Sequence, residues 1–169
     1  MTIAETARGA PPAASRHRGL RVGLAAIAVL ELLDAMMRVQ LLLPDYRHPA
    51  DVVQALTAAY FVLAPVVSGA ALLLAAIGRV RQAILALALL TLLTCLLQGI
   101  WLIGGSELPW AKGEPLLRLF IFPAAAIAAA ALAAKNRRLA IAGLLVCMPT
   151  IYSWVPIVFF TIGVVIYGA

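Results

Sequence analysis

Five long apolar runs limit the folds open to this chain more than any other feature of its sequence. They cover about residues 20–43, 52–78, 82–104, 116–134 and 139–167. A helix needs about 20 mostly apolar residues to cross the hydrocarbon core of a bilayer. Within that core, only helices and closed barrels satisfy their own backbone hydrogen bonds. The runs therefore predict an all-α integral membrane protein, a bundle of about five transmembrane helices.

The segments between the runs are too short to form further domains. They read "PDYRHPA", "GRVR", "SELPWAKGEP" and "KNRR". Residues 1–18 combine Pro, Ala, Ser and Arg without apolar periodicity, which predicts a disordered basic cytoplasmic tail. The run that follows is longer than the apolar region of a signal peptide, which favours a retained helix. We therefore expect one transmembrane helical domain over residues 19–169.

The composition supports a membrane protein and argues against a nucleic-acid partner. Hydrophobic residues make up 64% of the chain and charged residues 12%, against about 25% charged in soluble domains. The net charge of +6 is spread between apolar segments rather than gathered on one solvated surface. The apolar residues are largely Ala and Leu, and most of the basic residues are Arg. This usage is typical of GC-rich bacterial genomes. We therefore expect a multi-pass protein of the bacterial cytoplasmic (inner) membrane, in contact with the lipid bilayer.

The distribution of basic residues predicts the orientation of the chain. Nine of them fall on the side of the N-terminus and three on the opposite side, and basic loops usually remain in the cytoplasm. The N-terminus is therefore predicted to be cytoplasmic and the C-terminus outside. The first group comprises Arg8, Arg16, Arg18, Arg21, Arg79, Arg81, Lys135, Arg137 and Arg138, and the second Arg47, Lys112 and Arg118.

Residues that hold metals or cofactors are not grouped in this sequence. Cys95 and Cys147 lie inside apolar runs, where a small thiol packs as a hydrophobe. His17 and His48 are isolated in a tail and a loop, with no Cys or second His at ligand spacing. Phosphate-binding glycine loops and nucleophile elbows are also missing from the sequence. We therefore predict no metal and no cofactor, and we do not expect an enzyme.

Three ionisable residues inside the first run form the most informative pattern. At about 100° per residue, Glu31, Asp34 and Arg38 share one arc of about 60° on a helix. Asp34 precedes Arg38 by four positions, which favours an ion pair. Glu31 lies ~16 Å into the run, near the bilayer midplane, where ionisable groups are costly and usually functional. We expect Glu31 to exchange a proton or bind a ligand.

Polar residues on the third and fifth runs could complete a site with this charged stripe. The polar residues of the third run repeat on one helical face, at a depth similar to that of the charged stripe. The polar residues of the fifth run lie between Pro149 and Pro156, and each proline leaves a helix carbonyl without its hydrogen bond. We expect Glu31 to hydrogen-bond to Thr91, Thr94 or a carbonyl freed near Pro149. The predicted ligand or proton site comprises Glu31, Asp34, Arg38, Thr91, Thr94, Gln98, Thr150, Ser153 and Trp154.

Two functions are compatible with this pattern. The first is a transporter-like or solute-binding protein, with an outward-opening polar pocket around a protonatable Glu31. The second is a structural or accessory subunit, whose charges pair internally or with another membrane protein or a second copy of the chain. Packing is the favoured explanation for the hydroxyl groups by themselves, because interhelical hydrogen bonds in membranes contribute only about 0.6 kcal/mol. A membrane enzyme is the weakest alternative, because no nucleophile and base are assembled.

Overall fold

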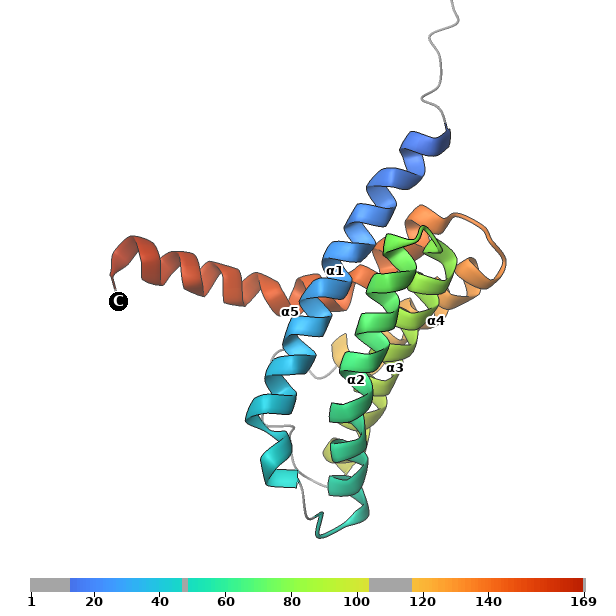
Figure 1. Cartoon of the computed structure of the whole chain (residues 1–169). Helices are drawn as coiled ribbons and strands as arrows, with labels where there is room; N and C mark the ends of the chain where they lie inside the picture. The colour runs from blue at the N-terminus through green and yellow to red at the C-terminus, as the bar shows by residue number, and fades with distance from the viewer. Residues whose placement is uncertain (1–12, 47–48, 104–116, 169) are drawn as a thin grey trace, which may run out of the picture.

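The described part of the chain is helical throughout. The structure is a computed structural model that describes residues 13–46, 49–103 and 117–168, and these residues form no strand (Figure 1). The short turns are a 3-10 helix, η1, and a π-helical turn, η2, which precedes α4. The elements are α1 (Ala13–Leu41), η1 (Leu43–Tyr46), α2 (Val52–Ala76), α3 (Val80–Ile103), η2 (Leu117–Ile121), α4 (Phe122–Ala134) and α5 (Leu139–Tyr167).

The all-helical fold and the five predicted helices are confirmed, with one difference at the N-terminus. α1 begins at Ala13, so that residues 13–18 of the predicted tail are helical. Residues 1–12 lie outside the described residues, as do His48 and the predicted outer loop with Lys112. The other four apolar runs match their helices within about two residues, because Pro, Gly and charged residues mark their ends.

Four helical segments are long and apolar enough to cross a membrane. They are α2, α3, Leu117–Ala134 and α5, with mean hydropathies from 1.8 to 2.3. α1 is 29 residues long, but every stretch of 18 residues within it carries at least three charged side chains. These four segments indicate a multi-pass membrane protein. The crossing of the membrane by α1 stays a prediction.

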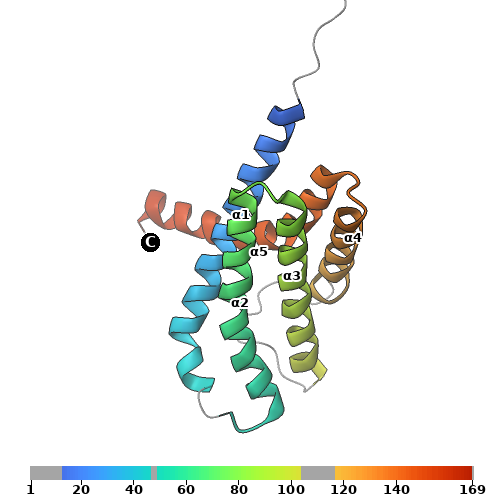
Figure 2. The same ribbon diagram turned by 45° about the vertical axis from the view of Figure 1, so that its right-hand side comes forward.

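Successive helices pack against one another in chain order, and α5 leaves the others. α1, α2 and α3 run side by side, and α4 lies beside α3 (Figures 1 and 2). The first half of α5 contacts α1, α3 and α4, and the buried residues of α5 end at Thr150. Its second half runs out to one side of the bundle in both views. The helix thus has a packed half and a projecting half.

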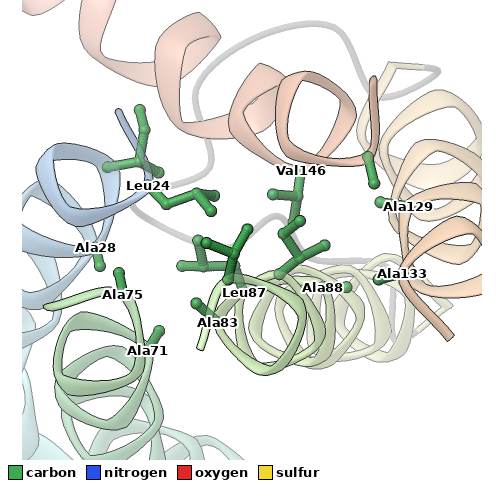
Figure 3. Packing of buried hydrophobic residues seen from close by; sticks show 14 of the residues in the cluster. Leu24, Ala28, Ala71, Ala75, Ala83, Leu87, Ala88, Ala129, Ala133 and Val146 are labelled. Atoms are coloured by element: carbon green, nitrogen blue, oxygen red, sulfur yellow. The ribbon is translucent and has the colours of Figure 1, made fainter. Parts of the chain in front are cut away.

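The main core is built largely from alanine. Of the 15 residues in the larger buried cluster, nine are Ala, drawn from all five helices (Figure 3). Small side chains allow helix backbones to approach closely, which is how membrane helices gain packing energy. Ala125, Ala129 and Ala133 of α4 are buried at four-residue spacing. Gly143 has the same role on α5, where an added Cβ would lie 2.6 Å from Leu20 Cδ1 of α1.

A second, aromatic core lies at the other end of α2 and positions the charged stripe. Phe61 is 1% exposed and contacts the ring of Tyr46 edge-on, with the ring centroids 5.6 Å apart. Tyr60 lies beside Phe61 in this cluster, which also contains Ala35 of α1 and Leu97 of α3. This cluster fixes α1, α2 and α3 around the polar groups described next.

Candidate functional site

The predicted ion pair within α1 is present. The Arg38 guanidinium contacts the Asp34 carboxylate one turn earlier on the helix. The side chains are 22% and 36% exposed, so that the pair is half-buried against the bundle. A local spacing of four residues is sufficient for this contact, which explains why the sequence alone revealed it.

A tyrosine that sequence analysis missed links this ion pair to two further helices. Arg38 Nη1 donates to Tyr60 Oη of α2 at 3.3 Å, and Tyr60 Oη lies 2.8 Å from Thr94 Oγ1 of α3. Thr94 Oγ1 also lies 2.9 Å from the Leu90 carbonyl, to which it donates. Because each hydroxyl has one proton, Tyr60 then donates to Thr94. The hydrogen bonds thus run from α1 through α2 to α3 in one direction.

Glu31 has a different partner from the expected ones. Thr150 Oγ1 of α5 donates to Glu31 Oε1 at 2.6 Å, and Thr150 is 4% exposed. The expectation of a bond to Thr91, Thr94 or a freed carbonyl is therefore replaced by this contact. The two residues are 119 positions apart in the chain, and only the fold brings them together. The contact lies where α5 leaves the bundle.

The other predicted site residues do not join this network. Thr91 donates to the Leu87 carbonyl at 3.1 Å and Ser153 to the Pro149 carbonyl at 2.9 Å, each within its own helix. Such bonds are the usual way in which a hydroxyl is satisfied inside an apolar helix. The side chains of Gln98 and Trp154, both half-buried, make no hydrogen bond with another described residue.

A separate contact between α2 and α3 was also missed. Trp101 Nε1 donates to Thr57 Oγ1 at 3.0 Å, and Thr57 is fully buried. This hydrogen bond joins α3 to α2 in addition to the one between Tyr60 and Thr94. Arg118 forms no ion pair with Asp34 in the described part of the chain.

These contacts provide the buried polar groups with hydrogen-bond partners and do not assemble a reactive site. Among the residues that the structure describes, every buried side-chain nitrogen or oxygen has a hydrogen-bond partner. The same residues contain no group of three His, Cys, Asp or Glu side chains close enough to hold a metal ion. The arrangement can fasten helices together, and it offers Glu31 as a titratable contact between α1 and α5.

A large cavity lies elsewhere in the molecule. It has a volume of about 930 Å³ and is open, and it is formed at the start of α1 by the α2–α3 and α4–α5 connections. None of the nine predicted site residues lines it. Along α1, Arg21 at the cavity and Arg38 in the ion pair are separated by 17 residues, or about 25 Å.

Comparisons of the chain with protein-family models, with curated proteins and with solved structures give no match.

Proposed function

We propose that this protein is a structural or accessory subunit of a membrane complex, without catalytic activity of its own. The single observation that carries the proposal is the projecting half of α5. Only 6% of the residues in the apolar 18-residue stretch of α5 are buried, against 28% to 39% in the other three candidate spans. The large apolar side chains of this half include Phe159 and Phe160, 71% and 74% exposed. Membrane helices associate through close packing, and this half has no such packing within the described chain.

The occupant that fits this half is an apolar membrane helix of another polypeptide. No ionisable side chain except Tyr167 lies between Ser153 and the end of α5, so that its surface offers packing rather than charge pairing. Gly163 of the same half has no heavy atom within 4 Å of an added Cβ, which leaves room for close approach of a second backbone.

The polar network supports the same proposal from inside the bundle. It uses the charged residues of α1 to join α1 to α2, α3 and α5, which is the internal form of charge pairing expected of a structural subunit. The use of such costly groups for contacts alone is reasonable, because interhelical hydrogen bonds favour one arrangement of helices over others that lipid contacts do not distinguish.

Five membrane crossings with a cytoplasmic N-terminus are part of the proposal. The positively charged α2–α3 and α4–α5 connections then lie in the cytoplasm with the start of α1. Reporter fusions after Arg79 or Lys135 are expected to report the cytoplasm, and a fusion at Ala169 the outer side. A cytoplasmic reporter signal at Ala169 would show that α5 or α1 does not cross.

The partner is tested by photo-crosslinking in native membranes followed by native mass spectrometry. A photoreactive residue at Phe160 is expected to give one protein adduct of fixed mass, and the purified complex a constant stoichiometry. The matched control is Val66 on α2, which is 64% exposed on the bundle and should give only lipid adducts. Lipid adducts at both positions, with a monomeric purified protein, would contradict the proposal.

A second candidate function is favoured by one contact. Thr150 is the only described partner of the Glu31 carboxylate, and it lies between the two prolines of α5 where the helix leaves the bundle. A carboxylate with one hydroxyl partner retains capacity for a proton or a bound solute. A transporter-like or solute-binding protein that uses Glu31 in this way is therefore the alternative proposal.

A further inference from the structure

The large cavity at the start of α1 gathers positive charge from separate parts of the chain. Arg18 and Arg21 come from α1, and Arg79 and Arg81 from the α2–α3 connection and the first turn of α3. Gln82 and Asn136 add two amide side chains, and no Asp or Glu lies among the lining residues. The nearest carboxylate on α1 is Glu31, ten residues or about 15 Å beyond Arg21. We call this cavity the basic cup.

Two helix ends build the rim of the basic cup. Just beyond the end of α2, Gly78 has φ +85°, and the Arg79 N–H donates to the Leu74 carbonyl at 2.8 Å. α4 ends in the same way, with Asn136 at φ +50° and the Arg137 N–H donating to the Leu132 carbonyl at 2.9 Å. These are the bonds of a helix C-terminus that turns sharply through a left-handed residue. The chain reversals bring both connections to the start of α1.

Arg21 is fixed in the wall of the basic cup by the end of α2. Its Nη2 donates to the Ala76 carbonyl at 2.6 Å and its Nε to the Ala75 carbonyl at 3.4 Å. A Cβ on Gly78 would lie 3.3 Å from Arg21 Cζ, so that glycine both adopts the left-handed turn and makes room for the guanidinium. Two of the five guanidinium N–H groups are used, and the remaining three can bind a ligand.

Orientation in the membrane explains why basic residues occur in these connections, but it does not require them to converge on one cavity. Phosphate groups match such a site, because arginine binds phosphate oxygens with two parallel hydrogen bonds. Basic cavities between membrane helices on the cytoplasmic side bind phosphate-bearing headgroups for the same reason. We propose that the basic cup binds a phosphate-bearing anion through Arg21, Arg79 and Arg81. The source is either the headgroup of an anionic phospholipid or a soluble phosphate.

The test uses the purified full chain and a charge-matched pair of double variants. Arg79 and Arg81 are exposed, and their replacement in Arg79→Gln/Arg81→Gln removes two charges from the basic cup. Lys135→Gln/Arg137→Gln removes two charges from exposed residues at the same end of the molecule, outside the lining. Retention of phosphatidylglycerol over phosphatidylcholine is measured by native mass spectrometry, with circular dichroism as the check of folding.

We expect Arg79→Gln/Arg81→Gln to weaken retention of phosphatidylglycerol about tenfold or more and the control pair to change it by less than about twofold. Competition by inorganic pyrophosphate then identifies the source. Displacement of the lipid by pyrophosphate would support a soluble phosphate, and retention of the lipid would support a headgroup. If Arg79→Gln/Arg81→Gln does not fold, Arg81→Gln alone is expected to weaken retention several-fold.

Equal losses in the two double variants would overturn the proposal, because they would show a diffuse surface charge rather than a site. Failure of the wild-type protein to prefer phosphatidylglycerol and to bind pyrophosphate would overturn it as well. The oligomeric state of the protein does not enter these outcomes, so that they are independent of the accessory-subunit proposal.

Discussion

Asp34→Asn is expected to lower the free energy of unfolding by about 2 kcal/mol, and Asp34→Asn with Arg38→Gln by only about 1 kcal/mol. The single substitution leaves the Arg38 guanidinium in a poorly solvated position without its counter-charge, which is more costly than removing both charges. A fully buried pair would lose about 3 to 5 kcal/mol, and the smaller figure reflects the 36% exposure of Asp34. In the double variant, the Gln amide can still donate to Tyr60.

The measurement is reversible unfolding in mixed micelles, followed by circular dichroism. Asp45→Asn is the matched control, because Asp45 is an exposed acid of η1, and its replacement should change stability by less than about 0.5 kcal/mol. Equal losses in the single and double variants would show that Asp34 and Arg38 do not depend on each other.

Gly143→Ile is expected to destabilise the contact between α1 and α5 by about 2 kcal/mol. A Cβ at this position lies 2.6 Å from Leu20 Cδ1 and 3.9 Å from Leu24 Cδ2. The Leu20 methyl group can move away from a single added carbon, but a branched side chain must push α1 and α5 apart, and overpacking costs about 1 to 3 kcal/mol. Separation of the helices would also lengthen the bond between Thr150 and Glu31.

Gly163→Ile is the control for this substitution. Gly163 lies on the same helix, and an added Cβ there has no heavy atom within 4 Å. Both substitutions remove a helical glycine, which by itself stabilises a helix by about 0.5 kcal/mol. The difference between the two variants therefore isolates the steric effect at the α1–α5 contact. Equal stability of the two variants would mean that α5 does not pack on α1 through Gly143.

The features that sequence analysis predicted correctly are local. The helices follow from long apolar runs, and the ion pair from two residues four positions apart in one helix. Each of these features depends on residues close together in the chain, where helical geometry fixes their relative positions.

The contacts between helices could not be predicted in the same way. Tyr60 was overlooked because a tyrosine among apolar residues is typical of a packed core, and its role depends on Arg38, 22 positions earlier. Thr57 lies on the same face of α2 as Tyr60 and accepts a hydrogen bond from Trp101. Its position in the sequence indicates a polar stripe on that helix. Glu31 and Thr150 meet across 119 positions, and no pattern in one helix specifies that pairing.

The projection of α5 and the basic cup could not be predicted from the sequence either. Pro149 and Pro156 indicate where α5 can bend, but not that its second half leaves the bundle. The arginines of the basic cup belong to separate connections, and they converge only because helix reversals at Gly78 and Asn136 bring those connections together. Counting charges gave the expected orientation, and it gave no indication of a shared cavity.

The structural role proposed for this protein makes the polar stripe of α1 a fixed internal contact rather than a path for protons or solutes. We test this role by infrared spectroscopy of the folded protein across the neutral pH range, following the carboxyl or carboxylate band of Glu31, which is identified by its absence in Glu31→Gln. Because Thr150 holds Glu31 in one contact at 2.6 Å, we expect this band to keep its position and intensity at every pH in that range. Interconversion of the carboxyl and carboxylate bands with pH would contradict this role, because it would show that Glu31 exchanges a proton in the folded protein.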